Sequence, residues 1–313
     1  MVAPPCLPAN EIAAVHARWR ADLPPLFAAD ADALLARISP PRWALEWSLP
    51  RWLGDALSVE PAHSSELVLA NVYGLAYIRI QDDLLDGDAP PAERVTAGRL
   101  SDALYPAWLA VYRRLLGSEP AFWARFEQYL AQWRQATLAS TQPMPTSLRA
   151  FTAADFATLG QRGAPLKVCA AAACILAQRQ EWLPPIEAIL DELLVAAVLL
   201  DHAVDWRADL AAGRANAFVA YAAAQPQTGA RRGANRLAVL NELAAGATGR
   251  PYFALIHSRL AVAAGQAEAL GLMALAHYIA WLGGQARTLS RNLSYTTRQW
   301  LRRATSELLP GVA

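Results

Sequence analysis

Three aspartates follow a long apolar stretch and could together bind a divalent cation. Asp82, Asp83 and Asp86 come directly after residues 67–80, which are apolar at nearly every position. In a helix, with about 100° per residue, Asp82 and Asp86 lie one turn apart on one face, and Asp83 lies about 60° from Asp86. Mg²⁺ prefers carboxylate oxygens and keeps waters and substrate phosphates as its other ligands. The spacing therefore predicts Mg²⁺ bound jointly by this first acidic motif and a diphosphate.

Two other interpretations of this stretch stay open. One is a solvated acidic helix end that binds nothing. The other is a calcium-binding loop, because Asp82, Asp86 and Glu93 have suitable spacing for one. Leu84 stands at a ligand position of such a loop, however, and Pro90-Pro91 interrupt it. The magnesium interpretation is therefore favoured.

A second group of aspartates recurs at every fourth position. Asp201, Asp205 and Asp209 follow Leu190 and the apolar stretch 193–200, and in a helix they lie within about 80° of arc. Like charges at this spacing destabilise an isolated helix, so their repetition indicates a ligand that offsets the repulsion. A purely structural role is the alternative. This second acidic motif predicts another carboxylate cluster for Mg²⁺ on a diphosphate, with three ions in all.

The two motifs together resemble those of the class I isoprenoid synthases, which include trans-prenyltransferases and terpene cyclases. The first has the Asp-Asp-x-x-Asp pattern, and its flanking Gln81 and Gly87 make it especially similar to the prenyltransferase form. The second has the spacing of the cyclase motif Asn-x-x-x-Ser-x-x-x-Glu but the all-acid character of a prenyltransferase motif. The resemblance covers roughly residues 40–305. It implies an all-α, single-domain bundle of the class I terpenoid synthase type around an apolar cavity.

Members of this family hold the diphosphate with basic and tyrosine side chains as well, and the resemblance implies which residues do so here. Arg162 and Lys167 resemble the diphosphate-binding arginine of cyclases or the lysine of prenyltransferases, although two ordinary surface bases are the alternative. Near the C-terminus, Arg287, Arg291 and Tyr295 share one helical face, and Arg291 and Tyr295 resemble the Arg-Tyr pair of cyclases. Arg207, beside the second motif, is a further candidate for binding the diphosphate. The catalytic set is then Asp82, Asp83, Arg162, Arg291 and Tyr295, with Lys167, Arg207 and Arg287 binding diphosphate.

The resemblance also helps to choose a reaction. Chain-elongating prenyltransferases carry a Gly-Gly-Lys-x-Arg segment before the first motif and an Arg-Arg pair soon after it, and neither is present at those places, where only Arg94 follows closely. We therefore expect a Mg²⁺-dependent terpene synthase, a lyase that ionises one allylic prenyl diphosphate. The bulky Tyr77, five residues before Asp82, favours a C10 or C15 substrate. The alternatives are a chain-elongating synthase, a head-to-head synthase of the squalene or phytoene type, and a non-catalytic isoprenoid-binding helical protein.

Composition excludes several other classes of protein. The chain has 313 residues, of which 55% are hydrophobic and 18% charged, and its net charge is +1. Such a chain can bury a large core and gives no reason to expect a nucleic-acid partner. The cysteines Cys6, Cys169 and Cys174 show no disulfide or zinc spacing. With no signal-peptide pattern and no apolar stretch long enough to span a bilayer, we expect a cytoplasmic protein without a transmembrane segment. A homodimer stays open.

The pattern of apolar residues predicts helices over almost the whole chain. No linker of low complexity divides it, so a single domain over 1–313 is favoured, with 1–40 as a peripheral N-terminal segment. The tryptophans Trp43, Trp47 and Trp52 form either core or a cavity wall that stabilises a carbocation. The predicted helices span residues 9–21, 26–37, 63–86, 92–116, 119–140, 146–160, 165–180, 185–212, 214–224, 230–245, 251–282 and 285–308.

Overall fold

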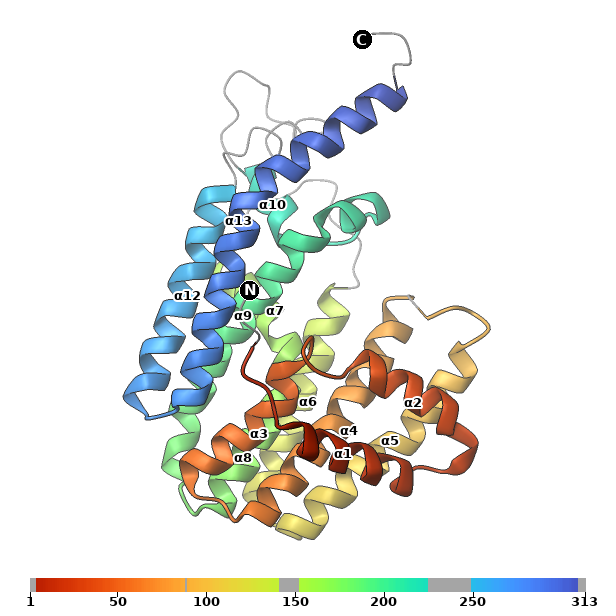
Figure 1. Cartoon of the computed structure of the whole chain (residues 1–313), viewed down its shortest axis with the longest axis vertical. Coiled ribbons are helices and arrows are strands. Elements are labelled where there is room, and N and C mark those ends of the chain that lie inside the picture. The colour runs from red at the N-terminus through yellow and green to blue at the C-terminus, as the bar shows by residue number, and fades with distance from the viewer. Residues whose placement is uncertain (1–3, 88, 141–151, 225–248, 309–313) are drawn as a thin grey trace. The chain divides into compact units, whose positions relative to one another are not determined.

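The computed structural model describes residues 4–87, 89–140, 152–224 and 249–308, and these are helical with no β-strand among them (Figure 1). The all-α class predicted from the sequence is confirmed. The chain divides into two compact units. Unit 1 comprises Met1–Leu138, Gln161–Leu190 and Ala263–Tyr278, and unit 2 comprises Ala139–Gly160, Asp191–Val262 and Ile279–Ala313. The single domain predicted over 1–313 stays a prediction.

Unit 1 contains the N-terminal helices and the first acidic motif, and unit 2 contains the second motif. The α-helices α6, α9, α12 and α13 contribute residues to both units. The helices before residue 140 are α1 (Ala9–Asp22), η1 (Pro25–Phe27), α2 (Ala28–Arg37), α3 (Ala44–Leu57), α4 (Pro61–Leu85), α5 (Arg94–Leu116) and α6 (Pro120–Ser140). The later helices are α7 (Ala153–Gly160), η2 (Gln161–Leu166), α8 (Lys167–Leu176), η3 (Gln180–Trp182), α9 (Leu183–Ala212), α10 (Ala217–Ala224), α12 (Gly249–Ala269) and α13 (Met273–Leu308).

Helix α4 is the central element of unit 1. It packs on α3 and α5, and residues from most of its faces are buried. The contact with α5 is close because Gly74 has no side chain: a Cβ added there would lie 2.6 Å from the Trp108 ring. On the other side, a Cβ at Gly54 of α3 would lie 2.2 Å from Ser64 Oγ. These two glycines fix the helix spacing that brings the C-terminal end of α4, with its aspartates, into place.

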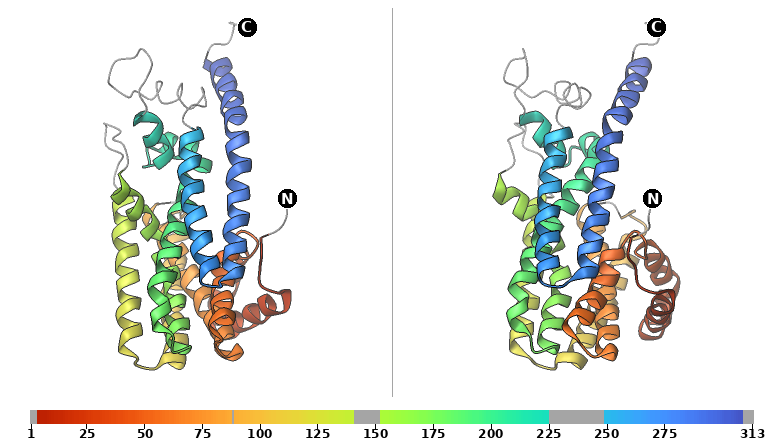
Figure 2. Two further views of the ribbon diagram at one scale, coloured as in Figure 1. Left: turned by 90° about the vertical axis from the view of Figure 1, so that its left-hand side faces the viewer. Right: turned by 60° about the vertical axis from the view of Figure 1, so that its left-hand side comes forward.

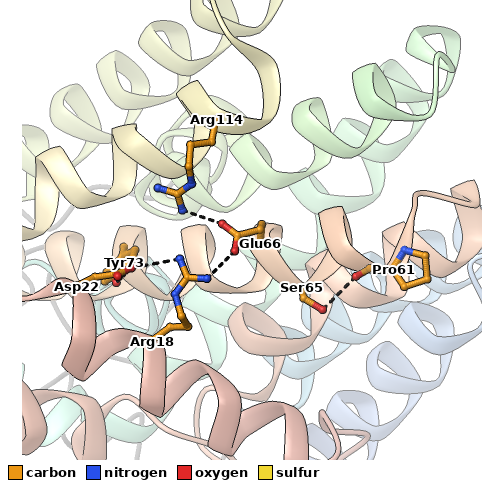
Figure 3. Close-up of polar contacts among 7 residues, drawn as sticks. All are labelled: Arg18, Asp22, Pro61, Ser65, Glu66, Tyr73 and Arg114. Carbon is orange, nitrogen blue, oxygen red and sulfur yellow. Dashed lines mark hydrogen bonds and ion pairs between the residues drawn. The ribbon is translucent and has the colours of Figure 1, made fainter.

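The N-terminal helices lie on the outside of unit 1, with α1 packed against α4 (Figure 2). Trp19 of α1 is fully buried and stacks on Tyr73 of α4, with ring centroids 5.4 Å apart. The Tyr73 hydroxyl donates a hydrogen bond to Asp22. Glu66 of α4 accepts hydrogen bonds from Arg18 at 3.0 Å and from Arg114 of α5 at 2.7 Å (Figure 3). The segment is thus attached by an aromatic contact and a polar network.

Two elements differ from the sequence-based expectation. Helix α3 was not predicted, because Pro50 lies inside it and proline removes a helical hydrogen bond; full burial of Trp47, Leu49 and Leu53 outweighs that cost. The predicted break between residues 282 and 285 was also wrong, because α13 continues through Gly283 and Gly284. The break comes earlier, where Gly271 adopts a φ of 73° after α12. The helix predicted over 230–245 lies outside the described residues.

Candidate functional site

The C-terminal end of α4 positions the first acidic motif. Asp86 is the C-terminal capping residue that directly follows the helix, and its backbone N–H donates to the Asp82 carbonyl at 2.8 Å. The motif separates into two groups with different neighbours. Asp82 and Asp86 lie near Arg162 of η2, whose Nη2 is 3.3 Å from an Asp86 carboxylate oxygen. The structure thus brings together three of the residues predicted from the sequence.

Asp82 is the most enclosed carboxylate of the motif, with 8% of its surface exposed. Its oxygen accepts a hydrogen bond from Trp133 Nε1 of α6 at 3.2 Å. Burial raises the pKa of the Asp82 carboxyl above its ordinary value, and the charges of Arg162 and Arg79 and the Trp133 hydrogen bond oppose this. A buried carboxylate is costly unless cations stabilise it. Asp82 therefore lies where a divalent cation would be favourable.

Asp83 belongs to a separate ion-pair group. Its two oxygens lie 2.8 Å from Arg79 Nη2, one turn earlier on α4, and 2.7 Å from Arg37 Nη2, at the end of α2. The Arg79 guanidinium also lies 5.5 Å from the centroid of the Trp43 ring. Both oxygens of Asp83 are therefore engaged by arginines. The i, i+4 spacing of Arg79 and Asp83 is visible in the sequence, whereas Arg37 is far away along the chain and was missed.

The tryptophans of residues 43–52 have different roles. Trp47 is fully buried and donates from Nε1 to the Ile38 carbonyl at 2.7 Å, so it belongs to the core. Trp43 lies beneath Arg79, next to the first motif. Trp52 contacts Tyr278, with ring centroids 5.7 Å apart. Of the three, Trp43 is the one that the structure places beside the candidate site.

Lys167 begins α8 and is buried, with 5% of its surface exposed. Its Nζ lies 6.0 Å from the centroid of the Tyr129 ring on α6, within reach of a cation–π interaction. The Arg162 side chain is 25% exposed. Neither residue is an ordinary surface base, which was the alternative left open by the sequence.

The second acidic motif lies on α9 in unit 2. Asp201 and Asp205 are exposed, and Asp209 is half-buried. Asn216, which is 1% exposed, donates from Nδ2 to Asp209 at 2.7 Å and to the His202 carbonyl at 2.9 Å. Its Oδ1 accepts from the backbone N–H groups of Phe218 and Val219, the second and third residues of α10, as a helix-capping residue does. Asp209 is thus fixed by an asparagine that the sequence analysis did not single out.

His202 is a further residue of this region that sequence reasoning missed. It is buried, and its Nδ1 accepts a hydrogen bond from the Ala217 backbone N–H at 2.9 Å. Because Nδ1 is the acceptor, a neutral His202 carries its proton on Nε2. Its position immediately after Asp201 offers no signal of this role, since the partner lies across the α9–α10 turn.

The remaining basic candidates also lie in unit 2. The Arg207 guanidinium lies 5.1 Å from the Trp206 ring centroid, and its Nε and Nη2 have no hydrogen-bond partner among the described residues. Burial lowers the pKa of the Arg207 guanidinium. Arg287 and Arg291 are exposed on α13, where Arg291 Nε donates to the Arg287 carbonyl at 3.3 Å. Tyr295 belongs to α13, and its side chain lies outside the described residues.

The carboxylates fit a magnesium ion in part. Within the described residues, no three His, Cys, Asp or Glu side chains are arranged to hold a metal ion together. Asp82 and Asp86 offer hard oxygen donors near one cation, Arg162, whereas Asp83 would have to exchange an arginine for a metal. The two motifs belong to different units, so the six-carboxylate site stays a prediction.

The comparisons with known proteins leave this site without a family to which it can be assigned. No protein-family model matches the sequence, and no curated protein matches it. Among the helices that the structure describes, none has the length and apolar character needed to cross a membrane.

Proposed function

We propose that the chain is a Mg²⁺-dependent terpene synthase that ionises an allylic prenyl diphosphate and releases diphosphate. One observation carries the proposal: the buried Asp82 and its neighbour Asp86 lie beside the guanidinium of Arg162 at the end of an apolar helix. Carboxylates that can hold a hard cation next to an arginine that can hold phosphate are what departure of a diphosphate requires.

Each residue has a role in this proposal. Magnesium, when bound, would neutralise the charge that develops on the departing diphosphate. Asp82 and Asp86 would hold the ion, and Trp133 would keep the Asp82 carboxylate oriented through its hydrogen bond. Arg162 would move from Asp86 to a phosphate oxygen, because diphosphate carries more charge than one carboxylate. Asp201, Asp205 and Asp209 would hold a third ion.

Aromatic rings near the motif support carbocation chemistry. Tyr77 of α4 contacts Tyr105, Trp108 and Trp133, with centroid distances of 5.0, 6.1 and 6.3 Å. Ring faces attract cations, and a water-poor aromatic surface protects a carbocation from premature capture. The half-buried Tyr77, little more than a turn before Asp82, also favours the shorter C10 and C15 substrates.

The direct test is incubation with geranyl, farnesyl or geranylgeranyl diphosphate and Mg²⁺. We expect release of diphosphate and formation of a hydrocarbon or alcohol, measured by a phosphate assay and by gas chromatography. The same reactions without divalent cation serve as the control. Equal turnover in metal-free buffer would contradict the proposal, and binding of substrate without release of diphosphate would instead indicate a non-catalytic isoprenoid-binding protein.

A second candidate function, joining of two isoprenoid units, is favoured by the arginines at Asp83. Chain elongation needs cationic donors for a second diphosphate, and Arg37 and Arg79 supply two guanidiniums next to the first motif. Adding isopentenyl diphosphate to each reaction distinguishes the two functions. Longer diphosphates formed only with both substrates would establish elongation, and a C30 product from farnesyl diphosphate would establish head-to-head coupling.

A further inference from the structure

Glu46 is a shielded carboxyl of unit 1 to which the proposed reaction gives no role. It lies in the first turn of α3, where its neighbours Leu45 and Trp47 are buried and Glu46 itself is half-buried. Burial nevertheless raises the pKa of the Glu46 carboxyl to about 7, so the part of its surface that stays open is shielded from bulk water. A carboxyl with open surface in a shielded place can meet a ligand.

Groups from two other helices of unit 1 face Glu46. On α4, Asn71 donates a hydrogen bond from Nδ2 to the Glu46 backbone carbonyl, and the charge of Arg79 lowers the pKa of the Glu46 carboxyl against the larger effect of burial. On α13, burial and then the nearby Glu46 charge raise the pKa of the Tyr278 phenol. Within the part of the chain that the structure describes, no basic side chain forms an ion pair with the Glu46 carboxylate, because Arg79 pairs with Asp83 instead. The carboxylate is therefore available to a ligand.

The position of Glu46 along α4 relates it to the first acidic motif. Arg79 precedes Asp83 by one helical turn, about 6 Å along the axis, and Asn71 lies two further turns back. Trp43, one turn before Glu46 on α3, has its ring 5.5 Å from the Arg79 guanidinium. The start of α3 thus follows α4 from the motif towards the apolar part of that helix. A prenyl chain that extends in this direction from a diphosphate at Asp82 and Asp86 passes Glu46 within its first few carbons.

The proposed reaction needs a base for its last step. Once diphosphate has left, a hydrocarbon forms when a carbon next to the cationic centre loses a proton and the electron pair of its C–H bond becomes the new C=C bond. An ionised carboxylate can accept that proton and later release it to water. Without a base, water adds to the cation and loses a proton, which gives an alcohol. A carboxyl that is partly ionised near neutral pH is suited to such a transfer.

We propose that Glu46 is the base that takes a proton from the carbocation and thereby sets the ratio of hydrocarbon to alcohol among the products. This inference rests on the proposed ionisation of an allylic prenyl diphosphate. It names a residue outside both acidic motifs and outside the basic candidates. The enclosed carboxyl lowers stability at neutral pH, as groups that serve a reaction in a shielded site commonly do.

The test measures product ratios of the full-length protein with geranyl or farnesyl diphosphate and Mg²⁺. Both products arise from the same cation, so their ratio does not depend on how fast diphosphate leaves. We expect Glu46→Gln to release diphosphate at a rate close to that of the parent, but with the ratio of hydrocarbon to alcohol lowered by at least about tenfold, since a positioned base contributes on the order of 100-fold or more to proton transfer.

Two further variants complete the experiment. Glu46→Asp keeps a carboxylate but withdraws it by one methylene group, and it should give an intermediate ratio. Glu127→Gln, at an exposed position of α6, is the matched control and should give the ratio of the parent. Urea denaturation of each variant confirms that it is folded, and Glu46→Gln should be at least as stable as the parent at neutral pH.

The outcomes separate this inference from the proposed function. An unchanged ratio in Glu46→Gln would overturn the role of Glu46 and indicate the departed diphosphate as the base, with the ionisation intact. Loss of diphosphate release in a folded Glu46→Gln protein would place the residue in the ionisation step and equally overturn its role as the base. A parent protein that yields only alcohol would overturn the base and leave the ionisation standing. Absence of diphosphate release from every prenyl diphosphate would overturn both proposals.

Discussion

The aspartates of the first motif are adjacent in sequence but differ in surroundings. Asp82 is enclosed and hydrogen-bonded to Trp133, Asp86 pairs with Arg162, and Asp83 is held by two arginines. One turn of helix is enough to separate them, because residues 82 and 83 differ by about 100° around the axis. The three carboxylates therefore should not respond alike to substitution.

The first prediction concerns Asp82→Asn. We expect diphosphate release to fall by at least about 100-fold, since a lost metal ligand removes on the order of 3 kcal/mol of transition-state stabilisation. The melting temperature should stay the same or rise, because the variant no longer buries a charge. Turnover assays and thermal denaturation measure the two effects, and Asp102→Asn, at an exposed position of α5, should change neither. A parallel loss of stability and activity would mean that Asp82 supports the fold instead.

The second prediction concerns Glu46 of α3. Burial raises the pKa of the Glu46 carboxyl from an ordinary value of 4.5 to about 7, against the opposing effects of its own backbone N–H and of Arg79. Between these pH values the folded protein binds a proton that the unfolded chain has released. The contribution of Glu46 to the free energy of unfolding is thus full below pH 4.5 and is lost as the pH rises towards 7.

Glu46→Gln removes this dependence. The variant should gain stability relative to the parent between pH 5 and pH 8 by on the order of 2 kcal/mol, measured by urea denaturation at both pH values. The exposed Glu127 provides the control, since Glu127→Gln should show no such gain. If the stability difference between Glu46→Gln and the parent were the same at pH 5 and pH 8, folding would not raise the pKa of Glu46.

At the scale of elements, the site depends on how closely the helices of unit 1 pack. Gly74 and Gly54 let α5 and α3 approach α4 at distances that any side chain would prevent. The arginines at Asp83 come from α2 and α4, and the partners of Asp82 and Asp86 come from α6 and η2. The surroundings of the aspartates at the end of α4 therefore depend on three other elements, α2, α6 and η2, that are held against it.

The third prediction tests the α4–α5 contact. Gly74→Ala should lower the free energy of unfolding by roughly 1–3 kcal/mol, because the new methyl group overlaps the buried Trp108 ring. Chemical denaturation measures the change. Gly98→Ala on α5 is the matched control: its added Cβ would meet no described atom within 4 Å, and alanine favours helix over glycine, so stability should be unchanged or rise by up to about 1 kcal/mol. Equal effects of the two substitutions would contradict the packing argument.

At the scale of the whole molecule, the two acidic motifs occur in different compact units. The first ends α4 in unit 1, and the second lies on the part of α9 that belongs to unit 2. If both motifs hold one metal–diphosphate group, binding of the metal and binding of the diphosphate must each strengthen the other. Linkage of this kind is measurable without a product assay.

The fourth prediction is that Mg²⁺ and inorganic diphosphate stabilise the protein together far more than separately. We expect the shift in melting temperature with both ligands to exceed the sum of the single shifts, because each ligand completes the binding site of the other. Asp82→Asn and Asp205→Asn, one from each motif, should each abolish the excess. Shifts that simply add in the parent protein would argue against a shared site.

Part of the site was predictable because it depends on local periodicity. A helix over an apolar stretch places residues separated by four positions on one face, so Asp82 with Asp86, and Asp201 with Asp205 and Asp209, could be grouped from spacing alone. Arg162 was identified by resemblance, and the structure places it at Asp86. The all-helical class followed from the same periodicity and is confirmed.

Local rules failed where tertiary burial outweighed intrinsic preference. Pro50 argued against a helix that the burial of its neighbours stabilises, and the glycine pair 283–284 argued for a break that did not form. A glycine inside a helix lowers the stability of the helix by only about 1 kcal/mol relative to alanine, and burial of neighbouring side chains readily offsets this loss. Gly271 ends a helix because its positive φ is part of the terminating turn.

The amino-acid sequence by itself therefore determined that the aspartates are carried by helices and which of them share a helical face, since helical spacing is a property of neighbouring positions; that they bind a cation stays a prediction. Only the tertiary structure decided the partners of those residues: the pairing of Asp83 with Arg37, the hydrogen bond of Asp82 to Trp133 and the support of Asp209 by Asn216. The physical reason is that the first two contacts join positions far apart in the chain and the third crosses a turn. The energy of each depends on burial and packing of whole helices, which no local pattern of residues specifies.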